Sequence, residues 1–213
     1  MGFKYRKYKN YAEYLAHQVR KVKKKGTLPR FKKRFSKRYS IIHARIKKLT
    51  EGLEKGIALC LGARLGEEVK SFLDLGFEHS IGVDLHPGPD NPYVVEGDFH
   101  HLKFEDKNFS IVYTNSIDHV FNLNQVIEEC SRVLEDHGIV IIEMSKSERF
   151  TTKWRNKKGY SQIESPRYFE SMVWNQLEDL VDSFKSMGFE EIRRVDDKSR
   201  LGVIFKKEHK IRR

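Results

Sequence analysis

Two glycines and an acid at the ends of apolar runs are the residues of this chain best placed to do chemistry. The run Ile57 to Leu61 leads into Gly62, Gly66 follows four residues later, and a helical pattern begins at once. A second apolar run ends at Asp84, eighteen residues beyond Gly66. Glycines let a backbone approach its ligand closely, and a carboxylate accepts hydrogen bonds from ribose hydroxyls. The pattern therefore predicts a nucleoside-binding site at two strand ends.

The elements that must position these residues follow an alternating pattern. We expect strands at 57–61, 81–84, 93–96, 109–114, 138–144, 190–195 and 201–206, and helices at 66–75, 122–136 and 172–187. Such alternation predicts a largely parallel sheet covered by helices. The residues between the last two strands are too few for a parallel crossover, so these strands should form an antiparallel hairpin. The expected fold is α/β, with a Rossmann-like, seven-stranded, mostly parallel sheet.

Glycines and turn residues mark the expected element ends. Gly76, Gly138 and Gly188 each stand after a helix and before a strand, where we expect them to end the helix. Between Asp84 and Val94 the chain is rich in proline and other turn formers, so no helix fits there. The segment 145–171 shows little periodicity, and a long loop after a strand's carboxyl end is often functional.

The N-terminal quarter of the chain is strongly basic. Residues 1–55 hold 19 Lys and Arg and three acids, a net +16, whereas the remainder holds 22 basic and 27 acidic residues, a net −5. Apolar residues at helical spacing predict two helices, Asn10–Lys25 and Arg30–Leu49, separated by a break at 26–29. We therefore divide the chain into a basic helical arm, 1–55, and a main domain, 56–213.

The arm has two interpretations. Its aromatic side chains among lysines could stack on and neutralise nucleic acid, and its charge also suits an anionic membrane or a phosphorylated substrate. The helical spacing favours the other interpretation, in which the aromatic residues pack the helices onto the main domain and the lysines are solvated. The aromatic residues concerned are Tyr5, Tyr8, Phe31, Phe35 and Tyr39.

The two cysteines, Cys60 and Cys130, lie in an expected strand and an expected helix, without the spacing of metal ligands. We expect both to be small core residues in a reducing compartment. No apolar run reaches transmembrane length, and the N-terminus lacks the apolar segment of a signal peptide. These observations predict a cytoplasmic protein, and the sequence carries no signal for an oligomeric state.

Four segments, in order and at workable spacing, resemble the class I S-adenosylmethionine-dependent methyltransferases. They are the glycine turn at 59–66, Gly82-Val83-Asp84-Leu85, the stretch 95–102, and the strand and strand end at 109–116. The match covers roughly residues 56–145 and, more loosely, the C-terminal hairpin. The chain departs from the family pattern at Cys60, where an acid is frequent, at Arg64, where a glycine is usual, and in lacking the helix after Asp84.

The resemblance implies S-adenosylmethionine as cofactor and a set of residues to hold it. Asp84 would bind the ribose, Asp98 the adenine amino group with His100 alongside, and the strand end at Asn115 would line the methyl-donor site. Because ligands of open α/β sheets sit outside the carboxyl ends of the strands, these residues should meet there. The full implied set is Gly62, Ala63, Arg64, Gly66, Asp84, Leu85, Asp98, Phe99, His100, Asn115 and Ser116.

Further charged residues have a structural and a functional interpretation each. Glu67 and Glu68 open a helix, where acids suit the positive end of the dipole, although one could meet the cofactor's amino group. Asp118 and His119 are the acid and imidazole nearest the expected methyl-donor site, so either could be a general base, or Asp118 could cap a helix above a packed His119. The histidines lack metal-ligand spacing, and no metal is expected.

The sequence thus predicts a methyltransferase that acts on a small polar or sugar-like acceptor, bound between the N-terminal helices, the loop near Asp118 and the segment 145–171. A second hypothesis is a nucleic-acid methyltransferase that uses residues 1–55. A third, motivated by Cys60 and Arg64, is a binding module of the same fold without catalytic activity.

Overall fold

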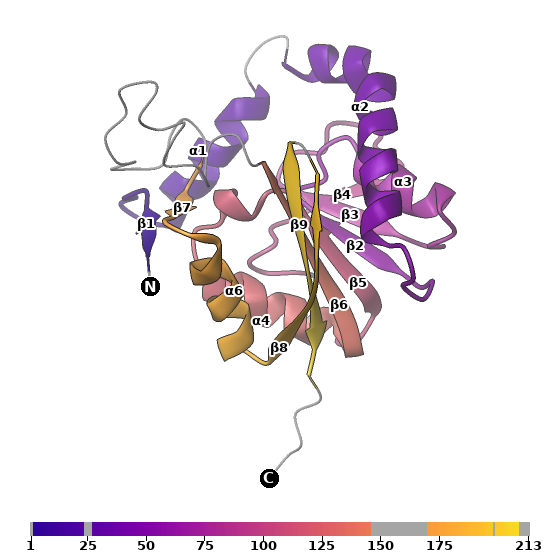
Figure 1. The fold of residues 1–213 in the computed structure, drawn as a ribbon. Helices are drawn as coiled ribbons and strands as arrows, with labels where there is room; N and C mark the ends of the chain where they lie inside the picture. The colour runs from indigo at the N-terminus through magenta and orange to yellow at the C-terminus, as the bar shows by residue number, and fades with distance from the viewer. Residues whose placement is uncertain (1, 24–26, 146–169, 198, 209–213) are drawn as a thin grey trace.

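The computed structural model describes residues 2–23, 27–145, 170–197 and 199–208 (Figure 1). In chain order the elements are β1 (Phe3–Tyr5), α1 (Tyr11–Lys23), α2 (Thr27–Leu49), β2 (Ala58–Leu61), α3 (Glu67–Asp74), β3 (Ile81–Asp84), β4 (Val94–Glu96), β5 (Phe109–Thr114), the 3₁₀ turn η1 (Ile117–His119), α4 (Leu123–Val133), β6 (Leu134–Ser145), β7 (Met172–Trp174), α6 (Leu177–Ser186), β8 (Phe189–Asp196) and β9 (Arg200–Lys207).

The main sheet has seven strands in the order β4-β3-β2-β5-β6-β9-β8. The first five strands in this order, β4, β3, β2, β5 and β6, run parallel to one another. Strand β9 pairs antiparallel with both β6 and β8. The expected α/β fold with an antiparallel C-terminal hairpin is confirmed. Because β3 and β5 lie on opposite sides of β2, the strand order reverses beside β2, and a crevice opens there at the carboxyl ends.

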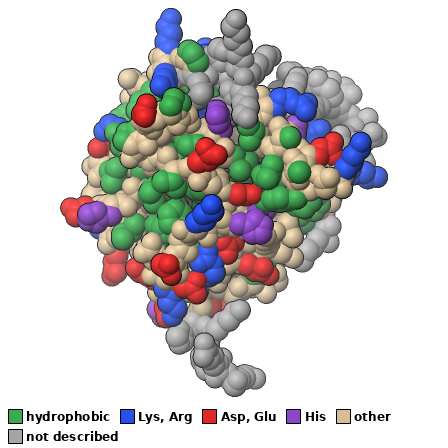
Figure 2. Space-filling model, turned by 180° about the vertical axis from the view of Figure 1, so that it is seen from behind, with side chains coloured by type: hydrophobic (Ala, Val, Ile, Leu, Met, Phe, Trp, Pro, Cys, Tyr) green, Lys and Arg blue, Asp and Glu red, His purple; other side chains and the backbone are tan. Residues whose placement is uncertain are grey.

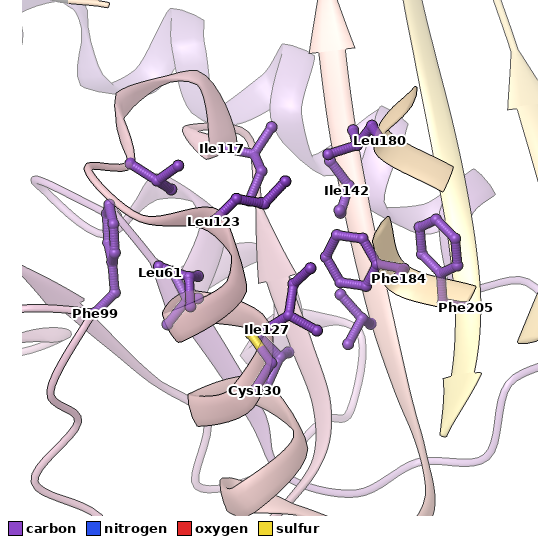
Figure 3. Packing of buried hydrophobic residues seen from close by; sticks show 14 of the residues in the cluster. Leu61, Phe99, Ile117, Leu123, Ile127, Cys130, Ile142, Leu180, Phe184 and Phe205 are labelled. Atoms are coloured by element: carbon purple, nitrogen blue, oxygen red, sulfur yellow. The ribbon is translucent and has the colours of Figure 1, made fainter. Parts of the chain in front are cut away.

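Helices cover both faces of this sheet (Figure 1). One hydrophobic cluster joins α4 and α6 to the sheet, through side chains such as Ile127, Phe184 and Phe205 (Figure 3). The second cluster joins α2 and α3 to the other face, through side chains such as Ile46 and Phe72. β2 contributes to both clusters because its residues alternate between the two faces, with Leu59 and Leu61 on the first and Ala58 and Cys60 on the second. The strand ends are therefore held from both sides.

The two halves of the basic helix α2 are packed differently. α2 lies along α3, and its Ile42, Ile46 and Leu49 are buried in the second cluster. Its Arg45 also forms an ion pair with the buried Glu143 of β6. The first turns of α2, in contrast to its second half, project beyond the strand ends (Figure 1). The expected packing of the apolar side chains is thus observed along the second half of α2.

Several expected element bounds are wrong. Residues 172–174, expected to begin a helix, form β7, because they pair antiparallel with the N-terminal strand β1. Residues 134–136, expected to end a helix, belong to β6, where Leu134 pairs with Phe109. α2 begins at Thr27 rather than Arg30, and Pro29 is tolerated because it falls in the first turn, where its missing N–H has no partner to lose.

The three glycines expected to end helices do not behave alike. Gly76 and Gly188 have φ values of +85° and +86°, as the expectation requires. Before the strand β6, however, it is His137 that has a positive φ, of +65°, and Gly138 does not. Gly138 is instead required for space, because a Cβ there would lie 2.9 Å from the side chain of Leu134 and 3.0 Å from the carbonyl oxygen of Glu135.

Within the described ranges, no helix is both long and apolar enough to cross a bilayer. Charge is unevenly spread over the face shown in Figure 2, with several Lys and Arg side chains projecting from its upper margin and acidic side chains more frequent below. The expected segment 145–171 falls almost entirely outside the described residues.

Candidate functional site

A pocket lies at the carboxyl ends of β2, β3 and β5, roofed by α1. It is lined by the glycine turn and the strand ends below, and by Tyr14, Gln18 and Val19 of α1 above. The predicted residues that line it are Gly62, Arg64, Asp84, Leu85, Phe99, Ser116 and His119. The cavity left between roof and floor has a volume of about 60 Å³. Ligand pockets commonly have about 300–1,000 Å³, so α1 lies close against the floor.

The glycine turn is held in a shape that only small residues allow at one position. Gly62 has a φ of +71°, and a Cβ there would lie 2.9 Å from the side chain of Ser116. Its N–H donates to the carbonyl of Val83 at 2.8 Å, which ties the turn to β3. Arg64 adopts a φ of +46° where a glycine is usual, and it keeps the left-handed conformation that the turn needs.

Asp84 closes this turn through backbone contacts. Its Oδ2 accepts the N–H of Arg64 at 3.0 Å, and its Oδ1 accepts the N–H of His86 at 2.9 Å. Asn91 holds the carbonyl of Arg64 from the other side, with its amide 3.0 Å away. The Arg64 guanidinium stacks over the ring of Phe31 of α2 at 4.4 Å, and burial is the main reason its pKa is lowered. The carboxylate therefore stands at the pocket with its orientation fixed.

Asp98 is held by one backbone N–H and by two side chains. The N–H of His100 donates to its Oδ1 at 2.9 Å. The ring nitrogen Nδ1 of His100 lies 2.9 Å from its Oδ1, and the hydroxyl of Tyr11 in α1 donates to its Oδ2. Burial opposes ionisation of Asp98, but the hydrogen bonds from His100 and Tyr11 outweigh it, so its pKa lies below the ordinary value. The Nε2 of His100 accepts the N–H groups of Phe121 and Asn122. Because Nε2 is an acceptor, the proton sits on Nδ1 and the ring is neutral.

The same aromatic cluster seats α1. Tyr11 and Tyr14 pack edge-on against the fully buried ring of His100, at centroid distances of 5.6 and 5.4 Å, and both contact Phe121. Asp98 and His100 thus form the base on which α1 rests and do not line the cavity themselves. The ring of His100 has a structural role here, and the prediction that its backbone flanks the adenine stays a prediction.

The acids that open α3 face inward. Glu67 pairs with Arg38 of α2 at 2.8 Å, and Glu68 accepts the amide of Asn115 at 2.9 Å. Both carboxylates are buried, and burial together with the nearby Glu67 raises the pKa of Glu68. The cap residue of α3 is Gly66, which has no side chain to cap the helix, while Glu67 and Glu68 lie in the first turn, where acids suit the helix dipole. A backbone hydrogen bond to the Glu68 carboxylate favours its charged form, so the expected interaction with the helix N-terminus is present beside the pairing with Arg38 and Asn115. Asn115, bound to Glu68, is not among the residues that line the cavity.

η1 places the predicted acid and imidazole beside the cavity. His119 lines it, and its Nε2 lies 3.9 Å from Oδ2 of the buried Asp118. The carbonyl of Asp118 accepts the N–H of Ser171, whose hydroxyl in turn contacts Tyr8 and Gln18. Gln18 therefore links the cavity wall of α1 to the segment before β7. Asp118 does not cap α4, because that helix is capped by Asn122.

Sequence reasoning missed the roof of the pocket. Tyr14, Gln18 and Val19 were expected to belong to an amphipathic helix, but nothing local to α1 indicates which strand ends it covers. His86, which also lines the pocket, is not among the predicted site residues. Two predicted residues, Ala63 and Gly66, are buried in the turn and do not line the pocket. In the part of the chain that the structure describes, no three His, Cys, Asp or Glu side chains gather as a metal site would require.

Comparisons with known proteins agree with this geometry. Residues 59–142 match a family model described as a methyltransferase domain. No curated protein matches the sequence significantly.

Solved structures share the fold at low sequence identity. A Pyrococcus horikoshii protein is 22% identical with a TM-score of 0.62, over 79% of this chain and 90% of that one. A Thermotoga maritima S-adenosylmethionine-dependent methyltransferase, described as a possible histamine N-methyltransferase, is 17% identical with a TM-score of 0.58, over 84% and 97%. A Haloferax volcanii chain, from a complex that contains the methyltransferase activator Trm112, is 14% identical with a TM-score of 0.62, over 92% and 98%.

Proposed function

We propose that this chain, which contains a class I S-adenosylmethionine-dependent methyltransferase domain, transfers the methyl group to a small polar or sugar-like acceptor beside His119. The observation that carries the proposal is that the turn residue Gly62, the acid Asp84 and the imidazole of His119 line one cavity. A cofactor held by the first two would have its reactive end near the third.

The residues of the floor fit S-adenosylmethionine. Gly62 and Ser116 both line the cavity, and they fit side by side only because Gly62 has no Cβ, which would lie 2.9 Å from Ser116. Asp84 offers carboxylate oxygens that suit ribose hydroxyls, and the apolar side chains of Leu85 and Phe99 offer contacts for a base. The roof must lift for so large a ligand, because the cavity is only about 60 Å³. Ala63, Arg64 and Gly66 shape the turn, and Asp98, His100 and Asn115 support its surroundings.

The bound cofactor supplies an activated methyl group on a positively charged sulfur. The protein's task is then mainly to align the acceptor with that group, because alignment lowers the activation barrier more than proton transfer does. A hydroxyl acceptor must also lose a proton, and the imidazole of His119 takes it as a general base. The carboxylate of Asp118, 3.9 Å from that ring, would stabilise the charged imidazolium.

The His119→Ala variant tests this assignment. We expect S-adenosylmethionine to bind within about threefold of the wild-type affinity by calorimetry. Release of S-adenosylhomocysteine in the presence of a set of hydroxyl-bearing sugars should fall by roughly 10²–10⁴-fold, the usual size of general acid–base catalysis. His79→Asn is the matched control and should retain turnover, because it removes an exposed imidazole at a position that does not line the pocket, and asparagine tolerates the positive φ there. Undiminished turnover in His119→Ala would remove His119 from the reaction.

Two other proposals remain for the whole chain. Residues 1–55 would act as a basic arm appended to the domain 56–213, and that arm could bring a nucleic-acid acceptor to the pocket. The exposed cations of α2, discussed below, favour this second candidate. A binding module without catalytic activity is the third, and failure to bind S-adenosylmethionine at millimolar concentration would favour it.

A further inference from the structure

A second cavity lies next to the pocket. The proposed methyl transfer takes place in the first pocket and gives this second cavity no role. It is an open groove of about 270 Å³ between the first half of α2 and the loop that joins β3 to β4. Its lining includes Lys32 and Phe35 of α2, Leu65, Tyr93 and three prolines of the loop. The wall between groove and pocket is thin, because Arg64 and His86 line the pocket while their neighbours Leu65 and Pro87 line the groove.

The groove exists because the β3–β4 connection contains no helix. Residues 85–93 return the chain in a loop that one side chain holds in place. The amide of Asn91 donates to the carbonyls of Arg64 and Pro87, and its oxygen accepts the N–H groups of Tyr93 and Val94. The prolines further restrict the backbone. The walls are therefore formed before any ligand arrives.

Unpartnered cations extend from the groove along α2. Residues 27–49 contain no acid, and the exposed cations of the first half, within the described residues, make no ion pair; they are Arg30, Lys32, Lys33, Arg34 and Lys37. By contrast, Arg38 is paired with Glu67, and Lys70 of α3 is paired with Asp74. The free cations cover about 10 Å of helix, more than a single phosphate needs. Among the described residues that line the groove, Asp90 is the one acid.

We propose that this groove binds single-stranded nucleic acid, with a base against Phe35 and Tyr93 and the phosphates along the first half of α2. Recessed aromatic rings beside a row of cations are the two elements that such binding requires. A membrane surface fits less well, because it needs protruding apolar side chains, and both rings are half-buried. The proposal does not rest on methyl transfer, since binding can be measured without cofactor.

Fluorescence anisotropy of the full chain with a labelled 12-nucleotide RNA tests the proposal. If about four phosphates are neutralised, raising the salt from 50 to 200 mM should weaken binding about 50-fold. The double variant Lys32→Ala/Lys33→Ala should flatten the slope of log affinity against log salt by about 1.4. Lys47→Ala/Lys48→Ala is the matched control, because it removes an adjacent exposed pair from the same helix roughly 20 Å away.

Two single variants test the groove itself. Phe35→Leu keeps an apolar side chain but removes the stacking ring, and should weaken RNA binding about tenfold. Asp90→Asn should strengthen binding two- to threefold, because it removes a negative charge from the lining of the groove. Thermal unfolding by circular dichroism shows that each variant is folded.

Four outcomes would overturn the proposal. Equal effects of the two lysine pairs would mean diffuse attraction by the whole arm, and unchanged affinity in Phe35→Leu would mean that no base enters the groove. Uridine monophosphate binding as tightly as the 12-mer would make this a mononucleotide site. Binding to vesicles rich in anionic lipid, with none to RNA at 50 mM salt, would make the surface a membrane contact.

Discussion

Asp84 ends the parallel strand β3 and Asp98 follows β4, and the two acids are held differently. Asp84 accepts hydrogen bonds from backbone N–H groups of its own loop and of the glycine turn. Asp98 also accepts one backbone N–H, that of His100, but it is held in addition by the side chains of His100 and of Tyr11, which lies 87 residues away in α1. The first acid is thus part of the floor of the pocket, whereas the second links the floor to the roof. We expect changes at Asp84 to alter the binding of cofactor and changes around Asp98 to alter access to it.

The largest effect is expected for Asp84→Ala. Charge-assisted hydrogen bonds contribute about 1.5–3 kcal/mol each, so loss of two to ribose hydroxyls should weaken S-adenosylmethionine binding at least 100-fold by calorimetry. Glu96→Ala is the matched control, because Glu96 is an exposed acid at the end of the neighbouring strand β4, paired in register with Asp84. Wild-type affinity in Asp84→Ala would show that the cofactor does not bind at this strand end.

A smaller effect, of opposite sign, is expected for Tyr11→Phe. The cavity under α1 is about 60 Å³, so the cofactor binds only when the roof has lifted, and the Tyr11–Asp98 hydrogen bond resists that movement. A ligand that binds one state gains affinity when that state is more populated. We expect affinity for S-adenosylmethionine to rise about tenfold, the equivalent of one such hydrogen bond.

Tyr39→Phe provides the control for this prediction. Tyr39 of α2 also donates to an aspartate, Asp74 of α3, but away from the pocket. Its loss should leave the affinity for S-adenosylmethionine unchanged. A fall in affinity for Tyr11→Phe would mean that Tyr11 stays in place when the cofactor is bound and helps to hold it.

The difference between the two acids also explains what the sequence could predict. Gly62, Asp84 and the spacing between them belong to one strand–turn–helix–strand unit, so short-range pattern reveals both the residues and their proximity. The roof depends on contacts between distant segments: Tyr11 with Asp98, and β1 with β7. Neither partner in those pairs signals the other, and Met172 to Trp174 are apolar in a way that also fits a helix. The floor was therefore predictable, and the roof was not.

The same limit applies to the charged residues beside the turn. Glu67 and Glu68 stand where acids favour a helix N-terminus, so capping was the natural interpretation. Their burial depends on α2, which supplies Arg38, and on β5, whose end supplies Asn115. Local pattern gives the identity of such residues but not whether a distant element covers them.

Acid titration offers a third way to test the link between floor and roof. Asp98 has a pKa below its ordinary value of 3.8 in the folded state, so its contribution to stability is present above that value and is lost as the pH falls through the folded pKa. Tyr11→Phe removes part of this contribution. Urea unfolding should show the variant less stable by about 1.5 kcal/mol from pH 5 to 7, with the difference shrinking below pH 3.8. A difference that does not change with pH would mean that Tyr11 stabilises α1 by packing alone.

The smallest effect is a change in stability, expected for Glu67 and Glu68, the buried acids that open α3. Its sign should differ between these two residues. The pKa of Glu68 is raised, first by burial and then by Glu67, so its favourable contribution is present below the ordinary value of 4.5 and is lost as the pH rises. Glu68→Gln keeps an acceptor for Asn115 without the buried charge, and should gain about 1 kcal/mol of stability at pH 7, a gain that fades towards pH 4. Glu67→Gln should instead lose stability, because Arg38 loses its partner. If both variants lose stability alike at pH 7, the charged Glu68 carboxylate is stabilised by its surroundings in the free protein. A lower affinity of Glu68→Gln for S-adenosylmethionine, measured by calorimetry, would indicate instead that this carboxylate meets the cofactor's amino group.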